Sequence, residues 1–289
     1  MSPAPASRVG VVGLGTMGAG IAQVCAQAGI ETVGREVSEE LCGRARERIA
    51  HYVGRGVEKG RLTAEERDAA LARLTTTTEL ADLAGCDVVI EAVVEELDVK
   101  RALFRELESV VGGDAVLATN TSALSVTAVA QATERPERVV GMHFFNPAPV
   151  LPLVEVVRTE LASDDAVETA YALAERLGKE PIHCNDTPGF VVNRILIPLL
   201  NDCVRVLDEA GVSPEDLDKA MTRGVNWPIG PCALIDLIGV DVHVHASEAL
   251  HDALGEARMA PPDRLVRMRN EGLLGRKSGE GFFRYEGAK

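Results

Sequence analysis

The chain contains 289 residues, of which 46% are hydrophobic and 26% charged, and its formal net charge is −14. This composition fits a folded chain long enough for two domains and excludes general disorder. The negative charge argues against nucleic acid or an anionic membrane surface as a partner. Since no run of about 18 apolar residues occurs, the sequence predicts no membrane span.

The six cysteines are scattered along the chain without CxxC spacing. This pattern favours buried thiols in a reducing cytoplasm and argues against a disulfide framework or a metal site. The start, MSPAPASR, lacks the apolar stretch of a secretory signal. It is expected to be a loose tail before a first strand.

Short β-branched segments alternate with helical segments through most of the chain. The stretch RVGVVGLGTMGAGIAQVCAQAG (8–29) predicts a strand, a glycine turn and a helix. An arginine-rich helical arm is expected over residues 39–74, with interruptions near Gly54, Gly56 and Gly60. Further strands are expected at 30–38, 87–94, 115–120, 138–145 and 181–184, and further helices at 97–110, 125–133 and 164–177. The alternation predicts an α/β fold, a doubly wound, mostly parallel Rossmann-type sheet with an inserted helical hairpin.

The pattern changes after Asp186, where the strand pattern ends. Residues 188–211, PGFVVNRILIPLLNDCVRVLDEAG, form one apolar-periodic segment, and Pro188 at its start suits a first helical turn. Ser213 is expected to cap the next helix, with Pro214 at its first position. The sequence therefore predicts a first domain over residues 1–185 and an all-helical second domain over residues 186–289.

A glycine fingerprint, Gly13, Gly15 and Gly18 in GLGTMG, follows the first predicted strand and opens a helix. In this context the first glycine permits a tight turn, the second lets the backbone approach a pyrophosphate, and the third allows close packing. A merely structural turn is the alternative. Glu36, at the end of the second strand, could accept ribose hydroxyls and repel a 2′-phosphate, which favours NAD over NADP. The neighbouring Arg35 could bind a 2′-phosphate, so NADP as the cofactor stays open.

The stretch GMHFFNPAPV (141–150) is unusual for a chain with only six phenylalanines. Two of them lie side by side between His143 and Asn146, and two prolines follow. An imidazole titrates near neutral pH, so His143 is a candidate general acid or base. A structural histidine in an apolar strand is the alternative.

With these motifs in order, the chain resembles the L-3-hydroxyacyl-CoA dehydrogenase family and looks closest to its short bacterial 3-hydroxybutyryl-CoA dehydrogenases. The resemblance runs from residue 8 to residue 285. It also includes IEAVVEEL (90–97), TNTSAL (119–124), DTPGFVVNR (186–194), NWPIGPCALIDLIG (226–239) and LLGRKSGEGFF (273–283). Because several separate motifs occur in the family's order and spacing, the probability of a chance agreement is very small.

The resemblance implies a catalytic pair, His143 and Glu155. Oxidising a secondary alcohol requires a base for the hydroxyl proton while hydride leaves the same carbon, and a carboxylate on the other ring nitrogen fixes the tautomer. Ser122 and Asn193 resemble residues that contact the substrate and could stabilise developing negative charge. Ser122 as a helix cap is the alternative.

The resemblance also implies further contacts with the cofactor. Glu95 and Lys100 match positions on the cofactor side. The alternative for these two residues is an ion pair on a helical surface. The arm at 44–73 coincides with the segment that receives the acyl carrier's phosphates, without individual assignments. The cofactor-binding residues are expected to be Gly13, Gly15, Met17, Gly18, Glu36, Glu95, Lys100, Asn120, Ser122 and Asn146.

The expected activity is NAD-dependent interconversion of (S)-3-hydroxyacyl-CoA and 3-oxoacyl-CoA, with 3-hydroxybutyryl-CoA and acetoacetyl-CoA as the short-chain pair. Two alternatives stay open: a related dehydrogenase for another hydroxy acid or a carrier-protein-bound group, and a non-catalytic NAD-binding structural or sensing protein. A cytoplasmic homodimer through the helical domain is expected. Pro152 and Trp227 depart from the family pattern and leave acyl-chain length and carrier preference open.

Overall fold

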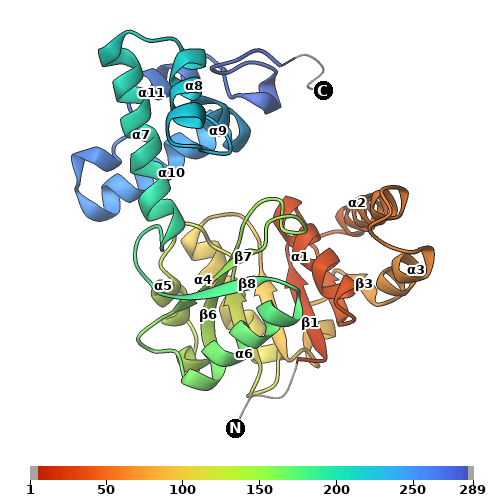
Figure 1. Ribbon diagram of the computed structural model, residues 1–289. Coiled ribbons are helices and arrows are strands. Elements are labelled where there is room, and N and C mark those ends of the chain that lie inside the picture. Colours follow the sequence, from red (N-terminus) through yellow and green to blue (C-terminus); the bar gives the residue numbers. More distant parts are fainter. Residues whose placement is uncertain (1–5, 286–289) are drawn as a thin grey trace. The chain divides into compact units, whose positions relative to one another are not determined.

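The computed structural model describes residues 6–285, so most of the tail expected at MSPAPASR lies outside the described residues, and its last residue, Arg8, begins the first strand. The chain divides into two units, Met1–Thr187 and Pro188–Lys289 (Figure 1). The first unit is built around one sheet, and the second is built from helices, so each is described by itself.

The sheet of the first unit has eight strands in the order β3-β2-β1-β4-β5-β6-β7-β8. The strands from β1 to β6 are parallel, whereas β7 runs antiparallel to β6 and parallel to β8. The predicted doubly wound, mostly parallel sheet is confirmed. The strands are β1 (Arg8–Val12), β2 (Glu31–Arg35), β3 (Leu74–Thr77), β4 (Val88–Glu91), β5 (Val116–Thr119), β6 (Val139–Phe144), β7 (Leu153–Arg158) and β8 (Glu180–Asn185).

Helices cover both faces of this sheet, as the alternation of its buried side chains requires. Val9 and Val11 of β1 pack with α1 and α6, whereas Val12 packs with α4. The opposite face is completed by α5, which carries Val129. The helices of this unit are α1 (Thr16–Gln27), α2 (Glu39–Glu58), α3 (Ala64–Ala72), α4 (Leu97–Val110), α5 (Val126–Ala130) and α6 (Asp164–Arg176), with short 3₁₀ turns η1 (Leu80–Leu83) and η2 (Pro136–Arg138).

The arm is a pair of helices, α2 and α3, beside α1 and β3 at one edge of the sheet (Figure 1). The predicted interruptions at Gly54 and Gly56 are wrong, because α2 runs unbroken to Glu58. A Cβ on Gly56 would lie 2.9 Å from the Leu62 side chain, so glycine lets the returning chain approach. The chain turns at Gly60, which has a φ of 66°.

Two strands of the sheet were not predicted from the sequence. The arm was expected to end at residue 74, where the short edge strand β3 begins, and neither β3 nor β7 was predicted as a strand. The strand β7 forms a hairpin with β6, in which His143 and Glu155 are direct partners.

The helix α5 is capped from two directions at its N-terminus. Ser125 is its N-cap and accepts a hydrogen bond from the Ala128 amide. The Asp186 carboxylate, from the last residues of the unit, accepts hydrogen bonds from the Val126 and Thr127 amides and from the Ser125 hydroxyl, at 2.7–3.1 Å. These bonds satisfy amides that would otherwise lack helical partners. The alternative in which Ser122 caps this helix is therefore wrong.

The second unit is helical in its described part. Its helices are α7 (Val192–Ala210), α8 (Pro214–Gly224), α9 (Pro231–Ile238), α10 (Val240–Leu254) and α11 (Asp263–Asn270), with 3₁₀ turns η3 (Ala257–Met259) and η4 (Arg276–Ser278). The cap predicted at Ser213, with Pro214 at the first helical position, is confirmed. The placement of Pro188 in the first turn of a helix is wrong. Residues 188–191 form a turn in which Gly189 and Phe190 have positive φ, which a right-handed helix cannot accommodate.

The closing segment of the second unit is held by one buried carboxylate. Asp236 of α9, which is 1% exposed, accepts hydrogen bonds from the Phe282 and Phe283 amides at 2.9 Å and from the Tyr285 hydroxyl at 3.0 Å. A Cβ on Gly281 would lie 2.1 Å from a carboxylate oxygen of Asp236. Glycine is therefore required for this close approach.

All six cysteines are free thiols, and five of them are buried. Among the helices of residues 6–285, none combines the length and the apolar character needed to cross a membrane.

A buried histidine in the second unit links the helical core. His243 of α10 is completely buried, and its Nε2 lies 2.9 Å from Oδ1 of Asn201. The Asn201 amide nitrogen lies 3.1 Å from the Met259 carbonyl oxygen, so this pair connects α7, α10 and η3. Burial lowers the pKa of His243 from 6.5 to about 4.

Acidification should therefore destabilise this chain through His243. The unfolded chain binds the proton near pH 6.5 and the folded chain only near pH 4, so the stability is present above the first value and lost between the two. A difference of this size corresponds to about 3 kcal/mol. Urea unfolding at pH 7 and pH 4.5 should show a smaller loss for His243→Gln than for the wild type. Equal losses in both proteins would contradict this role.

Candidate active site

The glycine fingerprint lies where β1 ends and α1 begins. A Cβ on Gly18 would lie 1.7 Å from the Gly13 carbonyl oxygen, so the turn and the helix can pack this closely only with glycine. A Cβ on Gly15 would meet no protein atom within 4 Å, so the space above this residue is open to a ligand. A phosphate at the N-terminus of α1 would also be stabilised by the helix amides. The turn therefore fits a dinucleotide pyrophosphate.

Glu36 follows β2 directly and is held against the glycine turn. Its two oxygens accept hydrogen bonds from the Leu14 amide at 2.7 Å and the Val37 amide at 2.9 Å. Nε of Arg35 donates to the Thr78 carbonyl oxygen at 3.2 Å. Gly34 makes room for Leu14, whose Cδ1 would lie 2.7 Å from a Cβ at position 34. Glycine at position 34 is thus required by the packing of Leu14 in the glycine turn.

His143 and Glu155 face each other across the β6–β7 hairpin. They are register partners, and Nδ1 of His143 lies 2.7 Å from Oε2 of Glu155. His143 is 6% exposed and Glu155 is fully buried. The Phe145 ring lies against the imidazole, with 4.5 Å between ring centroids. The Glu155 carboxylate at Nδ1 fixes one imidazole tautomer and holds the ring in place.

The polar residues of the strands point to the same face of the sheet. Val88 and Ile90 of β4 pack on the α1 face, so Glu91 points to the α4 face. Thr119 of β5 is the register partner of Glu91 and donates to its Oε2 at 2.7 Å. His143 and Glu155 share this face, because the residues on either side of each pack on the α1 face. Four buried polar side chains of β4, β5, β6 and β7 thus lie on one side of the sheet.

No role was predicted for Glu91 or Thr119 from the sequence. The pattern that could have found Glu91 is an acidic residue inside the apolar run VVIEAVV, because a buried carboxylate requires partners. The fully buried Lys100 supplies one partner at 2.6 Å.

Several other predicted residues gather around the ends of β5 and β6. Oδ1 of Asn120 accepts the Phe144 amide at 2.9 Å and so ties the two strand ends together. Glu95 accepts the Ser122 amide at 3.0 Å and lies 3.1 Å from the Lys100 ammonium. This pair is not on a helical surface, because the Lys100 side chain is 1% exposed.

The remaining predicted residues lie elsewhere. Met17 packs partly buried against the core from α1, and Asn146 lies in the exposed loop after β6, before a cis peptide bond to Pro147. Asn193 is the second residue of α7 and belongs to the second unit.

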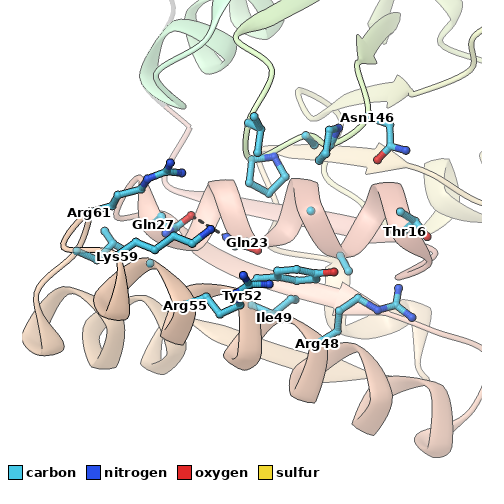
Figure 2. A pocket seen from close by; sticks show the side chains of 18 residues that line it. Thr16, Gln23, Gln27, Arg48, Ile49, Tyr52, Arg55, Lys59, Arg61 and Asn146 are labelled. Atoms are coloured by element: carbon cyan, nitrogen blue, oxygen red, sulfur yellow. Dashed lines mark hydrogen bonds between the residues drawn. The ribbon is translucent and has the colours of Figure 1, made fainter. Parts of the chain in front are cut away.

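A basic groove of about 560 Å³ lies in the first unit between α1, α2 and the loop 146–150 (Figure 2). Its four basic side chains all come from the arm, and Figure 2 shows the Tyr52 ring lying between Gln23 and Arg48. The residues that line the groove include Arg48, Tyr52, Arg55, Lys59, Arg61 and Asn146. The family resemblance implied phosphate binding along this arm, without individual residues.

A Rossmann-type sheet with an open glycine turn, an acidic residue after β2 and a buried imidazole–carboxylate pair defines a dinucleotide-dependent oxidoreductase. Residues 8–187 match the 3-hydroxyacyl-CoA dehydrogenase NAD-binding domain, and residues 189–285 match the C-terminal domain of the same enzymes. The chain therefore belongs to the 3-hydroxyacyl-CoA dehydrogenase family.

Relatives and solved structures agree with this assignment. The chain is 44% identical over 278 residues to a probable 3-hydroxybutyryl-CoA dehydrogenase of Deinococcus radiodurans, covering 96% of this chain and 100% of the relative. It is similar to the crystal structure of FadB2 from M. tuberculosis, with a TM-score of 0.95, 45% identity and coverage of 98% and 100%. It is also similar to (S)-3-hydroxybutyryl-CoA dehydrogenase PaaH1 from Ralstonia eutropha, with a TM-score of 0.94, 40% identity and coverage of 97% and 99%.

Proposed function

We propose that this enzyme interconverts (S)-3-hydroxybutyryl-CoA and acetoacetyl-CoA with NAD as the redox partner. The names of the similar proteins from Deinococcus radiodurans and Ralstonia eutropha support the substrate. The observation that carries the proposal is the buried contact of 2.7 Å between Nδ1 of His143 and Oε2 of Glu155. A pair of this kind can take a proton from a hydroxyl group and return it.

In the proposed mechanism His143 is the general base for alcohol oxidation and the general acid for the reverse reaction. Nδ1 of His143 is hydrogen-bonded to Glu155, so Nε2 is the ring nitrogen that exchanges the proton with the substrate oxygen. The positive charge that forms on the ring is stabilised by the Glu155 carboxylate. Bound NAD supplies the hydride acceptor.

Ser122 and Asn193 are proposed to donate hydrogen bonds to the substrate oxygen, where negative charge develops during reduction. For Ser122, the amide hydrogen bond to Glu95 at 3.0 Å gives support, because it holds the turn that carries this side chain. For Asn193, the support is the family resemblance of PGFVVNR.

The proposed NAD contacts begin at the glycine turn, where Gly13, Gly15 and Gly18 receive the pyrophosphate. Glu36 accepts the adenosine ribose hydroxyls, and its negative charge disfavours a 2′-phosphate. Arg35 is turned to Thr78, which supports NAD over NADP. The other proposed contacts are Met17, Glu95, Lys100, Asn120, Ser122 and Asn146.

Replacing Glu36 tests this cofactor preference. Glu36→Ala should raise KM for NADH by about 10- to 100-fold, the equivalent of one hydrogen bond to a charged group of roughly 1.5–3 kcal/mol. The ratio of kcat/KM for NADPH to that for NADH should rise, because the repulsion of the 2′-phosphate is lost. Arg35→Met is the matched control and should leave this ratio unchanged. A rise only in the control variant would contradict the role of Glu36.

The basic groove is proposed to receive the coenzyme A part of the substrate. Four cationic side chains line the groove, whereas the whole chain has a net charge of −14. The groove therefore offers a local positive charge that attracts phosphates. Tyr52, which is 54% exposed, offers an aromatic surface between them. The cations are Arg48, Arg55, Lys59 and Arg61.

The experiment that tests this function follows NADH loss with acetoacetyl-CoA, acetoacetyl-pantetheine and an acetoacetyl carrier protein. The proposal expects the highest kcat/KM with acetoacetyl-CoA, and a lower value for acetoacetyl-pantetheine because it lacks the nucleotide phosphates. No turnover with acetoacetyl-CoA would overturn the proposal. Higher kcat/KM with the carrier protein would favour the carrier-bound alternative.

A cytoplasmic homodimer is proposed as the working state. Its interface would include the exposed apolar residues Ile195 and Val206 of α7 and Val242 of α10, which are 61%, 48% and 50% exposed. The six free thiols are consistent with a reducing compartment. Sedimentation should give twice the chain mass, and Ile195→Glu with Val206→Glu should shift it to the monomer.

A further inference from the structure

The loop between β6 and β7 separates the basic groove from a second, smaller hollow. Residues 146–150 of this loop line one side of the groove (Figure 2). The second hollow, of about 400 Å³, lies between the loop, α1 and the end of α6. Pro149 and Val150 line both spaces, so at these two residues the wall of the groove is one chain segment thick. A wall with a hollow behind it lacks the close packing that holds most backbone in place, and it requires another support.

This support comes from Lys179, which lies between α6 and β8. Its Nζ donates hydrogen bonds to the carbonyl oxygens of Ala148 at 2.5 Å and Leu151 at 2.9 Å. These two residues flank Pro149 and Val150, so a single ammonium group holds both ends of the thin segment. Hydrogen bonds from a charged donor are stronger than those between neutral groups. The Lys179 side chain therefore ties the loop to the sheet from behind.

The first half of the segment also packs on α1. Ala148 is 2% exposed and belongs to the core of the first unit. A Cβ on Gly20 of α1 would lie 3.1 Å from Cδ of Pro149 and 3.3 Å from Cβ of Ala148. The loop thus comes close to the helix at this glycine, and it is fixed here by packing as well as by Lys179.

The second half of the segment has fewer supports. Val150 is 65% exposed, and its amide and that of Leu151 donate to the Pro147 carbonyl oxygen at 2.9 and 3.0 Å. This turn holds its shape, but its outer end is attached to the rest of the unit through the Leu151 carbonyl. Burial lowers the pKa of Lys179, which shows that its ammonium group has lost part of its hydration. The two carbonyl oxygens replace that hydration.

We propose that Lys179 is a positioning residue for the binding of coenzyme A, because it holds residues 148–151 as a fixed wall of the basic groove. This inference rests on the proposed role of the groove as the coenzyme A site. Within residues 6–285 Lys179 lines the second hollow rather than the groove, so it acts through the loop and not as a phosphate ligand. A preformed wall saves the cost of ordering the loop when the substrate binds.

The first measurement is made on the full-length enzyme without substrate. Lys179→Met removes the donor group and keeps most of the side-chain length, whereas Lys179→Arg keeps a cationic donor. Hydrogen exchange at the Val150 and Leu151 amides should be faster in Lys179→Met by about 10-fold, as expected when a charge-assisted hydrogen bond is lost. Exchange in Lys179→Arg should stay close to that of the wild type. Unchanged exchange in Lys179→Met would overturn the proposal.

The second measurement is the KM for two substrates at saturating NADH. In Lys179→Met the KM for acetoacetyl-CoA should rise by about 3- to 10-fold, the cost of ordering a few residues on binding. The KM for acetoacetyl-pantetheine should stay unchanged, because this substrate lacks the nucleotide that the groove receives. The kcat should stay unchanged as well, since His143 and Glu155 lie on β6 and β7. Lys179→Arg should restore the KM for acetoacetyl-CoA.

Arg176→Met is the matched control for this variant. Arg176 lines the same hollow and carries the same charge, but it donates to the Ala6 carbonyl oxygen and not to the loop. Its replacement should leave the KM for acetoacetyl-CoA at the wild-type value. An equal rise of this KM in Arg176→Met and Lys179→Met would show that only the charge of the hollow matters, and it would overturn the proposal.

Ionic strength separates positioning from direct attraction of phosphate. The ratio of the KM for acetoacetyl-CoA in Lys179→Met to that in the wild type should be the same at low and high salt, because salt screens charges and not the shape of a loop. A ratio that falls to one at high salt would show that Lys179 attracts the phosphates itself, against the proposal. If Lys179→Met does not fold, Lys179→Gln serves for the same measurements.

The positioning role and the proposed function fail differently. Absence of turnover in the wild type with acetoacetyl-CoA refutes the function. Wild-type turnover together with an unchanged KM in Lys179→Met refutes only the positioning role.

Discussion

Replacing His143 by glutamine is expected to lower kcat by about 10²- to 10⁴-fold while NADH still binds, because the amide cannot exchange the proton. The measurement combines initial rates of NADH loss with acetoacetyl-CoA and a fluorescence titration with NADH alone. The loss should appear in kcat as well as kcat/KM, since general acid catalysis acts in the transition state.

His183 provides a matched control for this variant. It lies on β8, stacks on Tyr171 with 4.3 Å between ring centroids, and has a side chain 49% exposed. His183→Gln should retain wild-type turnover. If His143→Gln also turned over within a few-fold of the wild type, the histidine would be structural, and a non-catalytic NAD-binding protein would become the better interpretation.

The second large effect is expected for Glu155→Gln. The variant keeps the shape of the side chain but removes the negative charge next to Nδ1 of His143. Because Glu155 is fully buried, no water can replace that charge, and kcat should fall by roughly 10²- to 10⁴-fold, as in other imidazole–carboxylate pairs. NADH affinity and KM for acetoacetyl-CoA should change little.

A double variant of His143 and Glu155 tests whether the pair acts as one unit. His143→Gln with Glu155→Gln should be no slower than His143→Gln alone, because Glu155 acts only through the imidazole. Glu168→Gln, which alters a surface carboxylate 3.8 Å from His183, is the control and should keep full activity. Multiplying losses in the double variant would show that Glu155 has a separate role.

Much of the fold was predictable from local sequence. The helix expected at 97–110 has these bounds in the structure, and the glycine turn lies between β1 and α1 as expected. These elements are determined by apolar periodicity and by glycines within one short segment. The strand β7 was missed because it is defined by its pairing with β6 across a proline-rich turn. Local sequence patterns do not report such a pairing.

The site was less predictable where long-range partners decide it. A serine at 122 and another at 125 are equally good caps by type. In the structure α5 begins after Ser125, where Asp186, some sixty residues away, binds the first helix amides. The buried Glu91 carboxylate is similarly explained by its hydrogen bonds from Lys100 and Thr119. Spacing along the chain cannot supply such partners, because they come from neighbouring strands and helices.

The attachment of Asp186 to α5 has a practical consequence for dissecting the enzyme. A truncated chain ending at residue 185 would delete the carboxylate that binds the first amides of α5, just after the turn that bears Ser122. Anyone wishing to express the nucleotide-binding half by itself should therefore retain residues 186 and 187.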